Sequence, residues 1–243
     1  MQQKNTANKD EIEKFDKLAK EWWNPKGKFA PLHKFNPIRQ EYLIDHISKN
    51  FNLNLNDTMP FKDLEILDVG CGGGLLCEPL SRLGAKMTGI DAAKTNIEVA
   101  KIHMKESGLN INYQNIKPEE ITVKKFDAIL CMEIIEHVED VDFFIESCVK
   151  LLKPGGVIFV ATLNKTLKSF ALAIVGAEYI LRWLPIGTHE WNKFISPNDV
   201  INKVSKFYLK HVETIGVIFN PLLNKWKLSN DTDVNYMCYF KKD

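Results

Sequence analysis

The sequence of 243 residues has no long apolar run and few cysteines. No stretch approaches the ~18 consecutive apolar residues typical of a membrane-spanning helix. Residues 1–20 contain acidic side chains and lack an apolar core, so they do not resemble a signal or transit peptide. The five cysteines are odd in number and show no CxxC spacing, which argues against a disulfide framework. We therefore expect a protein of the reducing cytoplasm.

An excess of charge of one sign is also missing. The net charge is +1, so no overall field favours nucleic acid, and we expect no nucleic-acid partner. Hydrophobic residues make up 45% and charged residues 26%, as in ordinary soluble globular proteins. The sequence has no internal repeat, and its length suits one large domain or two small ones.

Strand-like and helix-like segments alternate from Leu64 onward. Such alternation implies right-handed crossovers and a parallel sheet with helices on both faces. Two strand-like segments near the carboxyl terminus have only a loop between them and predict a hairpin. The expected fold is a Rossmann-like, doubly wound α/β domain with a seven-stranded mixed sheet. The predicted strands are 65–70, 85–91, 110–115, 125–132, 156–163, 207–219 and 235–242, and the predicted helices are 75–84, 93–108 and 140–156.

Two regions lie outside this alternation. Residues 1–60 contain helical stretches at about 9–22 and 38–50, which predict an N-terminal helical cap. Residues 164–195 form a helical insertion after the fifth strand, at the edge of the sheet where open α/β folds bind ligands. We expect the cap and the domain of residues 61–243 to form a single structural unit.

A glycine-rich loop, "LDVGCGGG", follows the first predicted strand. Gly70, Gly72 and Gly74 let the backbone turn tightly and approach a ligand. A dinucleotide fingerprint needs glycine where Leu75 stands, which disfavours an NAD oxidoreductase, and the Lys-Ser/Thr of a P-loop is missing. Asp91, at the tip of the next strand, is placed to accept both hydroxyls of a ribose. The glycines alone would also suit a purely structural turn.

The loop "LDVGCGGG" with the downstream "GIDAA" resembles the class I S-adenosylmethionine-dependent methyltransferases. Longer blocks are similar to the ubiquinone-biosynthesis O-methyltransferase family, namely "FDKLAKEWWNPKGKFAPLHKFNPIRQEYL", "CMEIIEHV" and "LKPGGVIFVATLNKTLKSFALAIVGAEYILRWLPIGTHEWNKFISP". The resemblance covers nearly the whole chain from about Phe15. One departure is a longer Asn-rich segment, "NKNFNLNLNDTMPFKDLE", which we expect to be a surface loop.

The resemblance implies S-adenosylmethionine as the cofactor. It carries the family's cofactor contacts to Arg39, Gly70 with the glycine loop that includes Gly72, Asp91 and Met132. From the residues alone, Arg39 would be interpreted as a surface arginine. Met132 would be interpreted as a core residue, although its polarisable sulfur could pack on adenine.

The implied reaction moves a methyl group from a sulfonium to a phenolic oxygen. The substrate class is a polyprenylated catechol or hydroquinone, of the 2-polyprenyl-6-hydroxyphenol and 3-demethylubiquinol type. A phenol with a pKa of ~10 is mostly neutral at physiological pH, so the enzyme needs a base or a cation that favours the phenolate. Other members of the ubiquinone pathway are possible protein partners.

Three ionisable residues, Glu133, Glu136 and His137, stand where the fourth predicted strand ends. If a helix starts at Glu133, positions i, i+3 and i+4 share one face and bring the three side chains together. Such a set could hold Mg²⁺ or another divalent cation, as the resemblance also implies. Two alternatives stay open: His137 acts as a general base without a metal, or the glutamates simply occupy the first turn of a helix.

The insertion carries a second catalytic candidate, His189, next to Glu190 in "GTHEWNKF". A structural role for this lone histidine also stays open. The stretch Leu167–Leu184 is rich in large apolar residues and has basic flanks, which suits a helix lying in a membrane interface. It would equally suit a lid packed on the sheet. The interfacial reading implies a cytoplasmic bacterial protein bound peripherally to the inner membrane.

Two further functions compete with this interpretation. Another small-molecule phenol O-methyltransferase would share the glycine loop and the acidic strand tip, but the apolar insertion argues against it. A cofactor-binding protein without catalysis is the alternative outside enzymes, and the retained Glu133, Glu136 and His137 argue against that.

Overall fold

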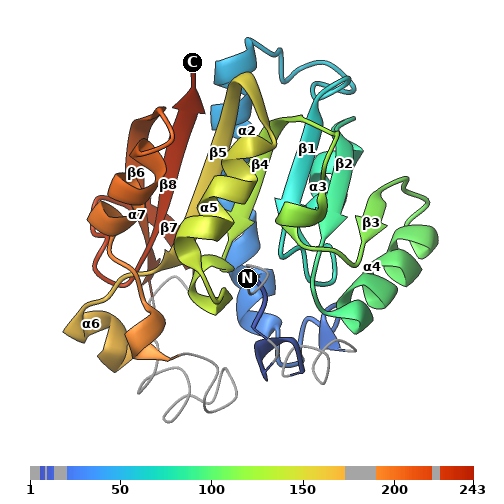
Figure 1. The fold of residues 1–243 in the computed structure, drawn as a ribbon. Coiled ribbons are helices and arrows are strands. Elements are labelled where there is room, and N and C mark those ends of the chain that lie inside the picture. The colour runs from blue at the N-terminus through green and yellow to red at the C-terminus, as the bar shows by residue number, and fades with distance from the viewer. Residues whose placement is uncertain (1–5, 9, 14–20, 173–189, 221–224) are drawn as a thin grey trace, which may run out of the picture.

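The computed structural model describes residues 6–8, 10–13, 21–172, 190–220 and 225–243. These residues form one mixed sheet in the order β3-β2-β1-β4-β5-β8-β6-β7 (Figure 1). The first five strands of that order are parallel, and β8, β6 and β7 are antiparallel to their neighbours. The strands are β1 Glu65–Val69, β2 Lys86–Ile90, β3 Asn112–Gln114, β4 Phe126–Met132, β5 Leu152–Leu163, β6 Leu209–Asn220, β7 Lys225–Ser229 and β8 Asn235–Lys242.

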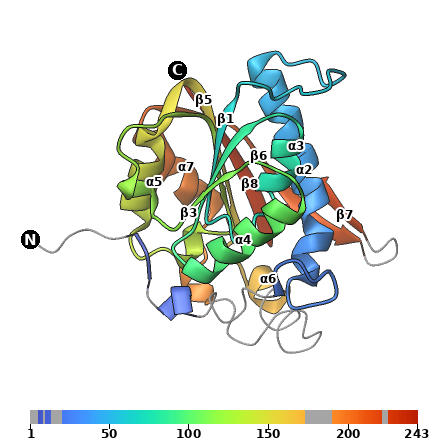
Figure 2. The ribbon, with the colours of Figure 1, turned by 90° about the vertical axis from the view of Figure 1, so that its right-hand side faces the viewer.

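Helices cover both faces of the sheet, as the alternating pattern predicts (Figure 2). The core therefore has two parts, one between the sheet and α2, α3 and α4, and the other between the sheet and α5 and α7. The central strands are largely apolar and are buried on both sides, as expected for a parallel sheet covered by helices. The helices are α2 Ala30–Phe51, α3 Cys77–Arg82, α4 Lys94–Glu106, α5 Val141–Lys150, α6 Leu167–Ser169 and α7 Pro197–Ser205.

The prediction of a seven-stranded sheet is wrong by one strand, because the described residues form eight. The extra strand is β7, which lies in the segment expected to be a loop between the two carboxyl-terminal strands. Its two lysines suit an exposed edge strand. Trp226 of β7 packs on Phe35 of α2 with ring centroids 4.7 Å apart. The pairing of β7 with β6 and this contact with α2 together distinguish so short a polar strand from a loop.

The structure corrects the predicted bounds of the helices in the N-terminal region. Residues 10–13 are helical, and 14–20 lie outside the described residues. The second helix begins earlier than predicted, at Ala30, because Pro31 falls in the first turn, where a missing N–H costs nothing. Pro37 lies inside the helix, although the sequence suggested a helix start there. The Asn-rich segment that follows is exposed over residues 54–59, as expected for a surface loop.

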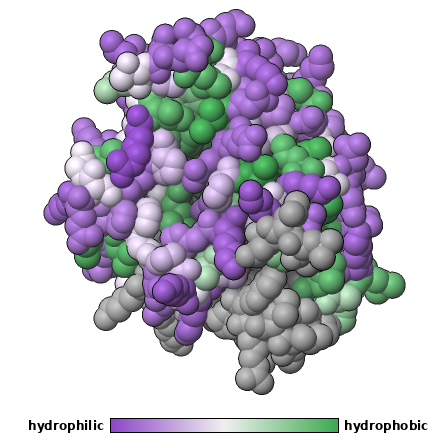
Figure 3. Space-filling view, turned by 180° about the vertical axis from the view of Figure 1, so that it is seen from behind, coloured by the Kyte–Doolittle hydropathy of each residue, from purple (hydrophilic) through white to green (hydrophobic). Residues whose placement is uncertain are grey.

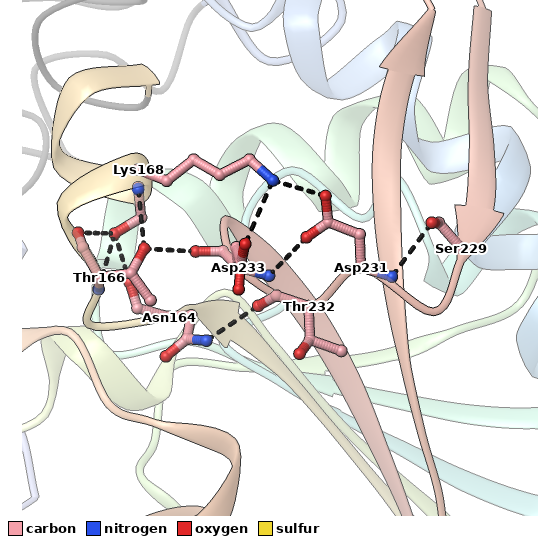
Figure 4. Close-up of polar contacts among 8 residues, drawn as sticks. Asn164, Thr166, Lys168, Ser229, Asp231, Thr232 and Asp233 are labelled. Carbon is pink, nitrogen blue, oxygen red and sulfur yellow. Dashed lines mark hydrogen bonds and ion pairs between the residues drawn. The ribbon is translucent and has the colours of Figure 1, made fainter.

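The start of the insertion is fastened to the turn between β7 and β8 (Figure 4). Lys168 pairs with Asp231 at 2.5 Å and with Asp233 at 3.3 Å. The Thr166 hydroxyl donates to the Asp233 carbonyl at 2.6 Å, and the Asn164 amide donates to the carbonyl of Thr232 at 2.9 Å. These contacts therefore fix the position of the first residues of the insertion, directly after the carboxyl end of β5. Among the described residues, no helix is both long enough and apolar enough to cross a membrane.

Candidate active site

A cavity lies at the carboxyl ends of β1, β2 and β4. The glycine loop, the tips of these strands and the amino-terminal part of α2 line it, together with residues 6–8 and 11–12 of the N-terminal segment. The cavity lining includes all the predicted site residues of the described chain, namely Arg39, Gly70, Gly72, Asp91, Met132, Glu133, Glu136 and His137. The carboxyl edge of a parallel sheet is where such folds bind ligands.

The glycine loop needs glycine for two separate reasons. Gly70 and Gly72 have φ values of +74° and +53°, in the left-handed region that other residues rarely adopt. Space is the second reason, because a Cβ on Gly72 would lie 2.4 Å from Cζ2 of Trp22. The Trp22 indole lies against the loop, donates to Asn96 Oδ1 at 2.8 Å and stacks on Phe29 at 3.9 Å. Trp22 and Phe29, which precede α2, thus cover the cavity at the glycine loop.

Replacing Gly72 with alanine is expected to lower the affinity for S-adenosylmethionine by roughly tenfold or more, since left-handed strain costs roughly 1–2 kcal/mol and Trp22 must also move. Isothermal calorimetry measures the affinity. Gly108→Ala is the matched control: its φ is +66°, but nothing lies within 4 Å of the added Cβ. Equal affinities for the two variants would show that the contact with Trp22 has no part in binding.

Asp91 connects the tip of β2 to the glycine loop. Its Oδ2 accepts from the Gly72 N–H at 2.9 Å, and its Oδ1 accepts from the Ala93 N–H at 2.8 Å. A carboxylate oxygen can accept more than one hydrogen bond. The structure thus places a carboxylate in the cavity lining at the tip of β2, the position that the sequence suggested.

Asp68, at the end of β1, is a cavity residue that the sequence reasoning missed. Only 2% of it is exposed, and its Oδ2 accepts from the Cys77 thiol at 3.3 Å. Burial raises the pKa of Asp68 to about 7, and the charge of Asp91 acts in the same direction. A carboxyl inside an otherwise apolar buried strand was the signal that could have identified it.

Arg39 is a buried residue of α2, so its interpretation as a surface arginine from the residues alone is wrong. Only 2% of it is exposed, and its guanidinium lies 3.8 Å over the Phe35 ring and pairs with Glu133. Burial lowers the pKa of Arg39, while Glu133 and Glu136 oppose that shift. Within the described residues, its Nε has no hydrogen-bond partner. A buried donor without a partner beside a cavity fits an anionic ligand group such as an amino-acid carboxylate.

The helix predicted to start at Glu133 is wrong. Glu133 continues the pairing of β4 with β5 through its N–H, which donates to the Ala161 carbonyl at 2.9 Å, and its φ is +57°. Only a short 3₁₀ turn, η3 Ile135–His137, follows. The i, i+3, i+4 spacing of an α-helix therefore does not apply to this stretch.

Each of the three ionisable residues has its own protein partner. Glu133 pairs with Arg39, as described above. Glu136 is 4% exposed, and its Oε2 accepts from the Thr162 hydroxyl at 2.8 Å. Burial and the neighbouring Glu133 raise the pKa of Glu136. His137 Nδ1 lies 3.0 Å from Oε2 of Glu11, a residue that no local sequence signal marked as part of the site.

This arrangement does not fit the predicted metal site. In the part of the chain that the structure describes, no group of three or more His, Cys, Asp and Glu side chains is arranged to hold a metal ion. A guanidinium cation already neutralises Glu133, and Glu136 Oε2 and His137 Nδ1 contact Thr162 and Glu11, while Glu136 Oε1 has no hydrogen-bond partner within the described residues. We therefore derive no chemical step through a metal ion.

The remaining predicted residues divide into two groups. Met132 ends β4, is 7% exposed and lines the cavity, where its thioether can contact an aromatic ligand. His189 lies outside the described residues. Its neighbour Glu190 is exposed and pairs with Lys193 of η5 Trp191–Lys193 at 2.8 Å. Glu190 does not line the cavity.

The sheet order and the glycine loop define the class. Two solved structures share the fold: the plantazolicin methyltransferase BpumL in complex with SAH, with a TM-score of 0.65, and the magnesium protoporphyrin IX methyltransferase ChlM of Synechocystis with bound SAH, with 0.64. They are 17% and 15% identical and cover 96% and 95% of this chain, which covers 98% and 94% of theirs. A protein-family model described as "Methyltransferase domain" matches residues 67–160. The fold is that of the class I S-adenosylmethionine-dependent methyltransferases.

Relatives with higher sequence identity identify the family within this class. The ubiquinone biosynthesis O-methyltransferase of Pelagibacter ubique is 56% identical over 98% of this chain and 100% of its own length. That of Brucella anthropi is 52% identical over 96% of this chain and 95% of its own length. The chain belongs to the ubiquinone biosynthesis O-methyltransferase family.

Proposed function

We propose that this protein is an S-adenosylmethionine-dependent O-methyltransferase of ubiquinone biosynthesis. Its substrates are the phenolic hydroxyls of polyprenylated catechols and hydroquinones, of the 2-polyprenyl-6-hydroxyphenol and 3-demethylubiquinol type. The observation that carries the proposal is 56% identity to a relative of that name over that relative's full length. The cavity at the sheet edge, with an acidic strand tip and a glycine loop, supports it.

The cofactor residues of the proposal are Arg39, Gly70, Gly72, Asp91 and Met132. S-adenosylmethionine, when bound, supplies an electrophilic methyl group on a positively charged sulfur. Arg39 would hold its carboxylate and Asp91 its ribose hydroxyls, while Met132 would contact the adenine. The buried Nε of Arg39, which has no hydrogen-bond partner among the described residues, and the place of the Asp91 carboxylate in the cavity lining support this fit.

The chain's own residues then act on the acceptor. Alignment of the phenolic oxygen with the methyl group supplies much of the catalysis in a displacement of this kind. His137 is the proposed general base, because it lines the cavity, is largely buried and is a group that accepts protons near neutral pH. Trp22 and Phe29 exclude water above the glycine loop.

A direct assay tests the proposed function. The purified protein is incubated with S-adenosylmethionine and a short-chain prenylated catechol, a demethylubiquinol analogue or an unprenylated catechol. Preferred methylation of the prenylated phenols supports the proposal. Faster turnover of the unprenylated catechol would favour another phenol O-methyltransferase. Calorimetric binding of S-adenosylmethionine without turnover would favour a cofactor-binding protein.

Membrane contact is a further part of the proposal, on the cytoplasmic face of the inner membrane. The prenylated substrate partitions into the bilayer, so the enzyme must reach it there. Leu167, Phe170 and Leu172, at the start of the insertion, are 81%, 42% and 54% exposed. The exposed Lys165 lies beside them, which suits an interface with anionic lipid, whereas Lys168 is paired with Asp231 and Asp233. Seen from behind, the described surface is mainly hydrophilic with separate apolar patches (Figure 3).

Replacing Leu167, Phe170 and Leu172 together with serine is expected to lower binding to anionic vesicles by roughly tenfold or more, because each buried side chain contributes about 1.5–3 kcal/mol. Co-sedimentation with liposomes measures this. The control is Leu55→Ser with Met59→Ser, since these apolar residues are 48% and 58% exposed in the loop after α2, at the opposite end of the sheet (Figure 1). Unchanged binding of the triple variant would remove the membrane role of these residues.

A further inference from the structure

We propose that Glu11 is a positioning residue of the active site, which orients the imidazole of His137 toward the methyl acceptor. The inference rests on the proposed function, because it assigns Glu11 to the proposed base. Glu11 belongs to the short N-terminal segment of residues 6–13, far from His137 in the sequence. The N-terminal segment thus contributes a side chain to the reaction site in addition to covering the cofactor.

The Glu11 carboxylate is held between two basic groups. Its Oε2 lies 3.0 Å from His137 Nδ1, and its Oε1 accepts from Lys193 Nζ at 3.3 Å. The side chains of Glu11 and His137 are each only 10% exposed, and both line the cavity. A largely buried carboxylate is costly unless it is paired, and both of these partners offset that cost.

The backbone before Glu11 pairs with the residues that directly follow η3. Ala7 forms an antiparallel bridge with Val138, and the Glu139 N–H donates to the Thr6 carbonyl at 3.0 Å. The Thr6 hydroxyl donates to Glu119 Oε2 at 2.8 Å. The bridge with Val138 places the segment directly beside η3, which carries His137.

A second set of contacts starts the helical turn that carries Glu11. Asn8 Oδ1 accepts from the Asp10 N–H at 3.0 Å and from the Glu11 N–H at 3.3 Å, as an N-cap does. The Ile12 N–H donates to the Asn8 carbonyl at 3.1 Å. The Asn8 side chain also donates to Glu139 Oε2 at 3.0 Å. These contacts determine where the Glu11 carboxylate lies.

This geometry has a consequence for the imidazole. A carboxylate at Nδ1 favours the neutral tautomer with the proton on Nδ1, which leaves Nε2 as the nitrogen that accepts a proton. The contact also fixes the plane of the ring, as the carboxylate does in a Ser-His-Asp triad. Lys193 lies near the end of the insertion, so the carboxylate links the N-terminal segment and the end of the insertion at one point.

The test uses Glu11→Ala and Glu11→Gln in the full-length protein. A glutamine still offers an oxygen to Nδ1–H, so it keeps the orientation, whereas alanine removes it. We expect kcat to fall roughly 10–100-fold for Glu11→Ala and clearly less for Glu11→Gln, in line with the effect of other orienting partners of histidine. The calorimetric Kd of S-adenosylmethionine is expected to stay within about twofold of wild type, as for a group that acts on the reaction step.

A spectroscopic readout separates orientation from general damage. In ¹⁵N-labelled protein, the His137 ring signals are expected to show the proton on Nδ1 in wild type and Glu11→Gln, and a shift toward Nε2 in Glu11→Ala. Glu13→Gln is the matched control, because Glu13 lies in the same turn and is exposed. It should match wild type in kcat and spectrum.

Three results would overturn the inference: an unchanged kcat in Glu11→Ala, an equal loss in Glu11→Gln and Glu11→Ala, or an unchanged His137 tautomer. Thermal unfolding identifies a variant that fails to fold, and in that case Glu11→Gln and the spectrum decide. The proposed function fails separately, if wild-type protein binds S-adenosylmethionine but does not methylate prenylated phenols. The tautomer measurement needs no turnover and still tests the contact.

Discussion

Replacing Arg39 with methionine is expected to lower the affinity for S-adenosylmethionine by roughly 10²-fold or more, because each hydrogen bond to a charged group contributes ~1.5–3 kcal/mol and an arginine offers two to a carboxylate. The variant also leaves Glu133 without its cation. Removing one partner of a buried ion pair costs ~3–5 kcal/mol of stability, and we expect the lower end because 23% of the Glu133 side chain stays exposed.

A double-mutant cycle separates the two effects of this change. Glu133→Gln removes the other charge, so the double variant Arg39→Met with Glu133→Gln is expected to unfold less easily than Arg39→Met alone. Its affinity for S-adenosylmethionine is expected to stay low, since the ligand carboxylate still lacks its partner. Chemical denaturation and calorimetry measure the two quantities. Arg82→Met is the control, because Arg82 is 55% exposed and does not line the cavity. Recovery of affinity in the double variant would contradict the role of Arg39.

The sequence predicts the central sheet well because its signals there are local. The segments predicted as 65–70, 85–91 and 125–132 agree with β1, β2 and β4 to within their ends. Each is an apolar run that ends at a turn, and neighbouring helices show the matching period. Strand β7 is short and polar and has no such signal. It pairs with the adjacent β6 in a hairpin, and its Trp226 packs on Phe35, a residue far away in the chain.

In the candidate site, the sequence predicts the role of a residue only where that role depends on the residue's own position in a strand or loop. Asp91 and the glycines follow from their position at strand tips. The arrangement of Glu133, Glu136 and His137 does not follow from their spacing, because a left-handed residue and a 3₁₀ turn replace the expected helix. Their partners lie 94, 26 and 126 residues away in the sequence, at Arg39, Thr162 and Glu11. No local pattern encodes contacts of that range.

The second large effect is expected at Asp91. Asp91→Ala should lower the affinity for S-adenosylmethionine by roughly 10²-fold or more, because two hydrogen bonds from ribose hydroxyls to a carboxylate contribute ~1.5–3 kcal/mol each. The change also removes the acceptors of two backbone N–H groups, those of Gly72 and Ala93. The ligand-free protein is therefore expected to lose stability as well, by ~1–3 kcal/mol for each group left unsatisfied.

Asparagine at the same position distinguishes the ribose contact from support of the loop. Asp91→Asn keeps one acceptor oxygen for the backbone but presents an NH₂ group where the second oxygen stood, so it cannot accept at both Gly72 and Ala93. Calorimetry is expected to rank the affinities as wild type, then Asn, then Ala. Asp45→Ala is the control, because the Asp45 side chain is 45% exposed and pairs with Lys49 on the same helix, α2. If Asp91→Ala loses stability but binds S-adenosylmethionine as wild type does, Asp91 supports the loop alone, and the ligand must lie elsewhere than at the tip of β2.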